Sequence, residues 1–264
     1  MDQYEKKALE ELQAWQKIML KKPTIFNKLA QNTQRKINSY IPEKIHHAIT
    51  AAIKNMVRAA LFGAEYTKSV DLPAFSSLES TEKKVREKIA FYKKTAGVEG
   101  GVTGAGGFLL GLADFPLLLF LKIKMLFDIA HAYGFDTSSY QERVYILLIF
   151  QLAFSSDEQR KKIFLQISNW QKYSEQMPKD IHDFDWRIFQ QEYRDYMDVA
   201  KFAQLLPIIG APVGFIVNRR LVEKLGFTAM NAYRMRIMPR GEQLVPPHVP
   251  PSEMLVDKKG FRQR

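Results

Sequence analysis

Apolar side chains recur at three- and four-residue intervals along much of the chain, the spacing expected of a helix face packed against a core. In residues 2–21 charged positions fill the intervals, and Pro23 ends the segment. The same reasoning predicts helices over about 24–39 and 43–62, with Pro42 between them. The apolar positions of the first helix are Tyr4, Ala8, Leu12 and Trp15.

Helix start signals continue through the middle of the chain. The Pro- and Ser-containing stretch 71–80 predicts a linker before a charged helix that opens at Ser80. Ser138 and Ser139 each stand three residues before a Gln or a Glu, which predicts two overlapping capping boxes at the start of another helix. The run 144–150 is apolar on every side, which is typical of a helix buried in the centre of a fold.

A glycine-rich stretch is the most unusual feature of the chain. Seven of the 14 glycines lie between Gly97 and Gly111, and five of them recur at spacings of 3, 4, 3 and 4. A helix would carry these five on one stripe, which lets another backbone approach closely. In water each glycine costs a helix about 1 kcal/mol relative to alanine, so tight packing must compensate. The stripe consists of Gly97, Gly100, Gly104, Gly107 and Gly111.

Phosphate binding is the competing use of such glycines, and its sequence pattern is absent. No Lys followed by Ser or Thr completes a P-loop, and the dinucleotide-binding spacing with its preceding strand is missing. We therefore expect helix packing here, and no cofactor.

The run 100–121 carries one charge, Asp114, and is long enough to meet the length rule for a membrane-spanning helix. Asp114 stands two residues before Pro116, however, which is the signature of a helix start. We therefore expect two shorter helices, over roughly 98–111 and 115–133. They would form an apolar hairpin that is either buried in the core or dipped into one leaflet of a membrane.

A second small-residue motif lies in the C-terminal half. Asp183 begins a predicted helix that runs to Leu206, and Gly210 and Gly214 follow as a GxxxG pair. Because two small faces permit a close helix crossing, this pair is a natural partner for the glycine stripe. The final segment, 238–264, is rich in proline and lacks periodicity, which predicts a disordered tail.

The chain has 264 residues, a formal net charge of +11 and no cysteine. Cysteine catalysis, thiolate zinc sites and disulfides are therefore excluded. Apart from the polar seam described below, no second cluster of His and carboxylates shows metal-ligand spacing, and no metal is expected. The N-terminus lacks the basic and apolar regions of a signal peptide. Residues 1–62 contain 11 Lys or Arg and 5 Asp or Glu, so over half of the excess charge lies there. Solvated helix faces are the default explanation of such lysines, and an anionic membrane surface is the alternative.

The second helix of the hairpin carries a polar seam. Asp114, Lys124, Asp128 and His131 fall within roughly a third of its circumference, and both Lys124–Asp128 and Asp128–His131 have helix-neighbour spacing. These groups are candidates for an acid/base or metal constellation in an apolar setting. The alternative is a helix cap with structural ion pairs.

The segment GGVTGAGGFLLGLADFPLLLFLKIKMLFDIAHAYGFD and the later IGAPVGFIVNRRLVEKLGFTAMNAYR together resemble the EcsC family of bacterial proteins. The resemblance covers roughly 45–237. It implies proteins encoded beside an ABC transporter that is tied to secretion and membrane-protein processing, and it carries over no catalytic residue. The positions at which it is strongest are Gly104, Gly107, Asp114, Phe115, Pro116, Lys124, Asp136, Glu142 and Arg143.

Together these patterns predict an all-α multi-helix bundle in three parts: a basic helical extension (1–42), an EcsC-like domain (43–237) and the tail (238–264). We expect a non-enzymatic cytoplasmic accessory protein that docks on the inner face of the membrane, through an anionic lipid surface or an integral membrane protein. The alternative is a lipid- or peptide-directed hydrolase that uses the polar seam. Nucleic acid is not expected as a partner, because no helix-turn-helix, zinc or aromatic RNA motif stands out.

Overall fold

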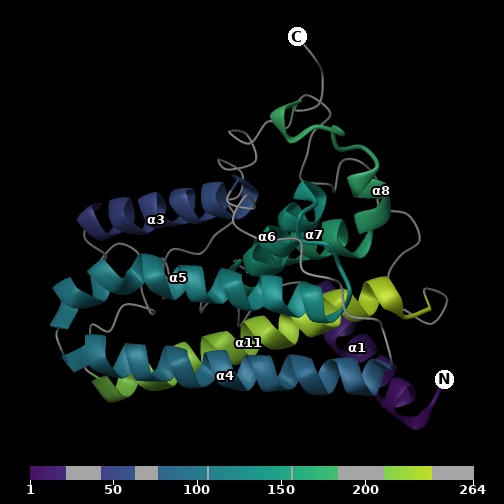
Figure 1. Cartoon of the computed structure of the whole chain (residues 1–264), viewed down its shortest axis with the longest axis horizontal. Coiled ribbons are helices and arrows are strands. Elements are labelled where there is room, and N and C mark those ends of the chain that lie inside the picture. The colour runs from purple at the N-terminus through teal and green to yellow at the C-terminus, as the bar shows by residue number, and fades with distance from the viewer. Residues whose placement is uncertain (22–42, 63–76, 106, 156, 184–210, 240–264) are drawn as a thin grey trace.

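The computed structural model describes residues 1–21, 43–62, 77–105, 107–155, 157–183 and 211–239 (Figure 1). All regular elements within these ranges are helices, so the expected all-α fold is confirmed. In chain order they are α1 (Gln3–Leu20), α3 (Glu43–Phe62), α4 (Leu78–Ala105), α5 (Gly107–Ala132), α6 (Tyr140–Phe154), α7 (Asp157–Ser168), α8 (Trp170–Ser174), the 3-10 turn η2 (Ile181–Asp183) and α11 (Ala211–Ile237).

Helix α1 begins at a capping box that the sequence interpretation did not identify. The Asp2 side chain accepts the Glu5 N–H at 2.7 Å, and the Glu5 carboxylate accepts the Asp2 N–H at 3.0 Å. Two otherwise unpaired backbone donors are thereby satisfied. Of the four apolar positions predicted to face the core, Ala8, Leu12 and Trp15 are buried, and Tyr4 is partly buried and packs against the core.

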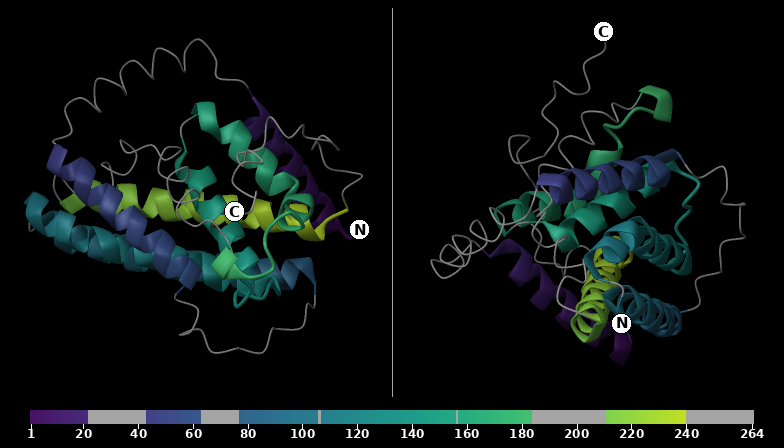
Figure 2. Two further views of the ribbon diagram at one scale, coloured as in Figure 1. Left: turned by 90° about the horizontal axis from the view of Figure 1, so that it is seen from above. Right: turned by 90° about the vertical axis from the view of Figure 1, so that its left-hand side faces the viewer.

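Three long helices, α4, α5 and α11, form the body of the molecule and lie side by side (Figures 1 and 2). Helix α11 runs antiparallel to α4, since Ile89 contacts Gly226 while Lys93 pairs with Glu223 at 2.8 Å. A Cβ atom at Gly226 would lie only 2.6 Å from Cδ1 of Ile89. Glycine at this position therefore allows the two backbones to approach closely.

The two arms of the predicted hairpin exist, but their boundaries differ from the prediction. Helix α4 continues from the charged segment through the glycines to Ala105, and α5 contains Pro116 in its interior. Asp114 therefore does not begin a helix. Proline costs a helix interior about 3 kcal/mol, and here tertiary packing outweighs that cost, since Phe115 and Leu119 on either side of Pro116 are buried.

The five glycines are consequently divided between two helices. Gly97, Gly100 and Gly104 belong to α4, whereas Gly107 and Gly111 belong to α5. The prediction of one stripe on one helix was wrong, because the chain reverses direction within the glycine-rich stretch.

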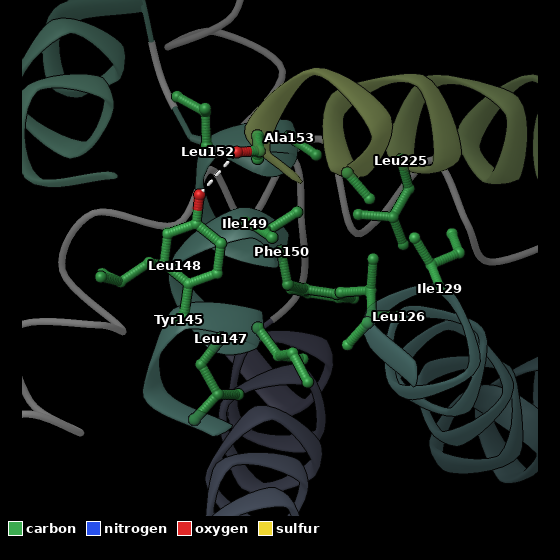
Figure 3. Packing of buried hydrophobic residues seen from close by; sticks show 14 of the residues in the cluster. Leu126, Ile129, Tyr145, Leu147, Leu148, Ile149, Phe150, Leu152, Ala153 and Leu225 are labelled. Atoms are coloured by element: carbon green, nitrogen blue, oxygen red, sulfur yellow. Dashed lines mark hydrogen bonds between the residues drawn. The ribbon is translucent and has the colours of Figure 1, made fainter. Parts of the chain in front are cut away.

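Helix α6 is the buried central helix that its apolar run predicted. Side chains on all of its faces are buried, among them Tyr145, Phe150 and Leu152, and they pack against Leu126 of α5 and Leu225 of α11 (Figure 3). This helix is the centre of the hydrophobic core. Helices α3, α5, α7 and α11 pack against it.

Some of the predicted start signals act differently from the prediction. Ser139 is the N-cap residue of α6, but its side chain makes no capping bond and its Oγ contacts Gln141 instead, 2.6 Å from Oε1. Asp136 holds the turn before it by accepting the backbone N–H of Ser138 at 2.8 Å. Helix α4 begins at Leu78 rather than Ser80, with Ser77 Oγ accepting the Ser80 N–H at 3.1 Å.

Several predictions lie outside the described residues: the helix over 24–39, the helix from Asp183 to Leu206, Gly210 and the tail from residue 240. Among the helices that are described, none combines the length and the apolar character needed to cross a membrane.

Candidate functional site

The polar seam forms a link between the two arms of the hairpin. The Tyr92 hydroxyl on α4 donates to Asp128 Oδ2 at 2.7 Å, and Lys124 Nζ lies 3.5 Å from Asp128 Oδ1. Burial raises the pKa of the Tyr92 hydroxyl well above its ordinary value, and the adjacent carboxylate raises it further. Tyr92 therefore stays protonated and serves as a hydrogen-bond donor that joins α4 to α5.

The structure brings together two of the four predicted seam residues. Lys124 and Asp128 meet, whereas the side chain of Asp114 lies outside the described residues. His131 is half-buried one turn further along α5, where its backbone oxygen accepts the Gly134 N–H at 2.9 Å. Within the described part of the chain, no group of three His, Asp or Glu side chains is placed to hold a metal ion.

A larger polar network, which the sequence interpretation missed, lies at the other end of α4. The Arg234 guanidinium on α11 donates from Nε and Nη2 to the two oxygens of Glu82, both at 2.6 Å. Both side chains are buried, with 2% and 0% exposed. The hydroxyls of Tyr4 and Tyr133 also donate to Glu82, at 2.6 and 3.2 Å, and Glu11 accepts from Arg234 Nη1 at 3.0 Å.

These contacts determine the ionisation of the pair. Burial alone would raise the pKa of the Glu82 carboxyl, but the hydrogen bonds and charge of Arg234, with the two tyrosine hydroxyls, outweigh burial and lower it. Glu82 in turn raises the pKa of Arg234 above its ordinary value, against the effect of burial. The pair is therefore charged and hydrogen-bonded on both sides, and it fastens α1, α4, α11 and the turn that follows α5 together.

A second arginine lies beside this network. Arg236 Nη1 donates to Glu142 Oε2 at 2.6 Å, and its guanidinium stacks 3.7 Å from the centre of the Phe135 ring. The Tyr233 hydroxyl donates to the other Glu142 oxygen at 2.8 Å. Burial nevertheless raises the pKa of the Glu142 carboxyl above its ordinary value, despite both donors. Of the positions selected by resemblance, Glu142 thus has a clear role in holding α6 to α11.

A sequence signal for Glu82 does exist. It stands four residues after the buried Leu78 and three before the buried Val85, so it occupies a core position of α4. A charge at such a position is rarely buried without a partner. Its partner could not be chosen from the sequence, because Arg234 lies 152 positions away.

Two further polar side chains are buried in the apolar half of the bundle. Lys122 of α5 is buried, and its Nζ donates to the Leu118 carbonyl at 3.3 Å. Asn218 of α11 is fully buried, and neither amide atom has a hydrogen-bond partner among the described residues. In the close view Leu225 of α11 lies beside Ile129 of α5 (Figure 3). Continuing that parallel register for two turns brings Asn218 alongside Lys122.

The glycine-rich end of α4 lies at the level of the start of α11. The Ile89–Gly226 and Lys93–Glu223 contacts set an antiparallel register between α4 and α11. Continued along both helices, this register brings Gly100 and Gly104 level with the first turns of α11. Gly214 lies there, and Gly210 lies outside the described residues. Close packing of the two small-residue motifs stays a prediction, and this register supports it.

Large apolar side chains on the outer surface of the hairpin are exposed to solvent. Phe91 on α4 and both Leu117 and Phe120 on α5 are exposed, whereas neighbouring apolar side chains of the same helices are buried. Folding therefore leaves this apolar surface outside the core.

Comparison with known proteins gives matches that extend over most of the chain, from α1 to α11. A family model described as the EcsC protein family matches residues 6–238. The chain is 45% identical over 231 residues to "Protein EcsC" of Bacillus subtilis (strain 168), covering 87% of this chain and 94% of that protein. It is 27% identical over 247 residues to "Uncharacterized protein YdbA" of the same organism, covering 86% and 90%. No solved structure matches the chain.

Proposed function

From the premise that the chain belongs to the EcsC protein family, we propose that it is a non-enzymatic accessory protein that docks on the cytoplasmic face of a membrane. Anionic phospholipid is the proposed partner. Since no described helix is suited to cross a bilayer, the proposed attachment is peripheral.

The charge of the hairpin is the observation that carries the proposal. The described side chains of α4 and α5 include seven Lys or Arg outside the core and three acidic ones outside the core, Glu79, Glu87 and Asp128. Each Lys or Arg near an anionic surface contributes about 1 kcal/mol of attraction. The N-terminal helices add to this charge, but the hairpin combines it with exposed apolar side chains.

Three of the seven cations are also engaged within the protein, and one of them, Arg86, donates to the Tyr4 hydroxyl at 2.7 Å and lies 3.5 Å from Glu82 Oε2. Lys93 pairs with Glu223 and Lys124 pairs with Asp128, in both cases near the surface. Exposed pairs of this kind contribute little to stability, so these lysines can contact lipid phosphates at small cost.

A vesicle flotation assay tests the proposal. The protein is mixed with phosphatidylcholine vesicles that contain or lack phosphatidylglycerol, and the fractions are then washed with salt or carbonate. We expect flotation with the anionic vesicles only, and release by high salt, because surface charge interactions are screened. Complete recovery of the protein in the unbound fraction at low salt, with both kinds of vesicle, would contradict the proposed membrane docking.

We also propose that the protein works beside an ABC transporter or a system for secretion or membrane-protein processing. The family resemblance alone supports this part. Detergent extraction followed by affinity purification of the tagged protein tests it, because a transporter should be retained through a salt wash that removes lipid-bound protein.

A further inference from the structure

We propose that one face of the molecule, the outer side of the α4–α5 hairpin opposite α11, is the surface that enters an anionic bilayer. Phe91, Leu117 and Phe120 are its apolar anchors. This inference rests on the proposed membrane function and assigns that function to particular residues.

The three anchor side chains are far more exposed than the core side chains of the same helices. Phe91 is 64% exposed, Phe120 57% and Leu117 48%. On α5, Leu117 and Phe120 are three residues apart and Lys124 follows four later, so all three lie on one stripe of the helix. A helix stripe of this kind, apolar with basic residues along it, is typical of segments that lie in a membrane interface.

Phe91 points away from α11. Ile89 and Lys93 both contact α11, and each is two residues from Phe91. Positions two apart on a helix point about 200° apart. Phe91 therefore faces solvent on the side of α4 that is remote from α11.

Phe120 points away from α11 as well. Ile129 lies against Leu225 of α11 (Figure 3). Phe120 is nine residues before Ile129, which at 3.6 residues per turn corresponds to about half a turn. The anchors of the two helices are thus on the same side of the hairpin.

The Tyr92–Asp128–Lys124 link fixes the two helices relative to each other beneath this surface. Because Tyr92 bonds to Asp128, Phe91 lies at about the level of Ile129. Phe120 is then about nine residues, or roughly 14 Å, further toward the end of the hairpin. Lys124 lies between the two phenylalanines, where its ammonium group can reach a lipid phosphate.

The surroundings of the anchors grade from basic to apolar. Three lysines, Lys84, Lys88 and Lys94, and one acidic residue, Glu87, are within seven residues of Phe91 on the same side of α4, and none of them is buried. Beyond Leu117 the hairpin ends in the glycine-rich apolar stretch. That end lies at one extreme of the long axis, away from α1, α7 and α8 (Figures 1 and 2).

Charge selects the bilayer over a second copy of the chain as the occupant. Two copies joined by this face would bring together two surfaces that each carry four lysines, Lys84, Lys88, Lys94 and Lys124, against one exposed acidic side chain, Glu87. Like charges that face each other across an interface oppose association. An anionic lipid surface supplies the complementary charge and an apolar interior for the aromatic rings.

Vesicle partitioning of paired variants tests the face. The double variant Phe91→Ser with Phe120→Ser removes two anchors, and Ile18→Ser with Phe227→Ser removes two apolar side chains of comparable exposure elsewhere, 50% and 45%. We expect the first pair to lower the partition coefficient for anionic vesicles at least about tenfold, and the second to leave it within about twofold. Urea unfolding midpoints equal to wild type confirm that both variants fold.

A second pair of double variants distinguishes the effect of where the basic residues lie from the effect of the net charge of the protein. Lys84→Glu with Lys94→Glu should weaken binding strongly, whereas Lys7→Glu with Lys172→Glu makes the same change in net charge on α1 and α8 and should weaken it less. Equal losses in the two members of either pair would overturn the proposed face while the membrane function stands. Failure of the wild-type protein to bind any vesicle would overturn both.

Discussion

The buried ion pair between Glu82 and Arg234 makes a quantitative prediction about stability. Replacing Glu82 by Gln keeps the shape of the side chain but removes its charge, which leaves the Arg234 guanidinium buried without its principal partner. Breaking one side of a buried ion pair costs about 3–5 kcal/mol. We expect Glu82→Gln to lose free energy of unfolding in this range.

Glu11→Gln is the matched control, because it removes a second carboxylate from the same arginine. Glu11 is 44% exposed, and its oxygen lies 3.0 Å from Nη1 of Arg234. Exposed ion pairs contribute about 1 kcal/mol or less, so this variant should lose correspondingly little. The two variants therefore differ in burial rather than in chemistry.

Urea unfolding measures the loss of free energy in both variants, and the fluorescence of the buried Trp15 and Trp170 reports the transition. At a typical urea dependence of about 1–3 kcal/mol per molar, a loss of 3 kcal/mol moves the midpoint by roughly 1–3 M. Equal losses in the two variants would refute the reasoning. So would a cost of less than about 1 kcal/mol for Glu82→Gln.

The same pair predicts the direction of a pH effect. Because its partners hold the pKa of Glu82 below its ordinary value, its contribution to stability is present above that ordinary value. The contribution is lost as the pH falls through the lowered value in the folded protein. The difference in stability between wild type and Glu82→Gln should therefore be largest near neutral pH and shrink in acid.

Three further substitutions test other parts of the structure. Gly226→Leu should lower the unfolding midpoint strongly because even a Cβ there meets Ile89 at 2.6 Å, and Ile89→Ala should restore part of the loss; an unchanged midpoint contradicts the close crossing. Asn218→Leu should raise the free energy of unfolding by about 1–3 kcal/mol, since it removes a buried amide without described partners. A loss instead would show that this amide is bonded. Asp128→Asn should cost about 1–3 kcal/mol, because it weakens the hydrogen bond from the buried Tyr92 hydroxyl as well as the ion pair with Lys124, and it should leave vesicle binding intact; loss of vesicle binding in a folded variant would contradict a structural role.

The helices themselves were largely predictable, because the spacing of apolar residues and the placement of prolines carry most of that information. The range 43–62 coincides with α3, and the buried positions of α1 follow from spacing alone. The break in the hairpin was not predictable in this way. Asp114 and Pro116 form a strong local start signal, and the packing of neighbouring apolar side chains overrides it.

The polar contacts likewise divide into those that local spacing predicts and those that only the fold brings together. Lys124 and Asp128 were predicted to pair because they are four residues apart on one helix, but Tyr92 comes from another helix and could not be chosen. Glu82 and Arg234 meet across 152 positions, which no local pattern encodes. Local spacing thus identifies which residues share a helix face, whereas the fold decides what that face meets.

The most direct test of the membrane account uses the absence of cysteine in this chain. Phe120→Cys and Ile18→Cys each provide a single attachment point for an environment-sensitive fluorophore. On addition of anionic vesicles, the account predicts a blue shift of the emission at position 120 and none at position 18. Unchanged emission at position 120, or equal shifts at both positions, would contradict insertion of the α4–α5 face.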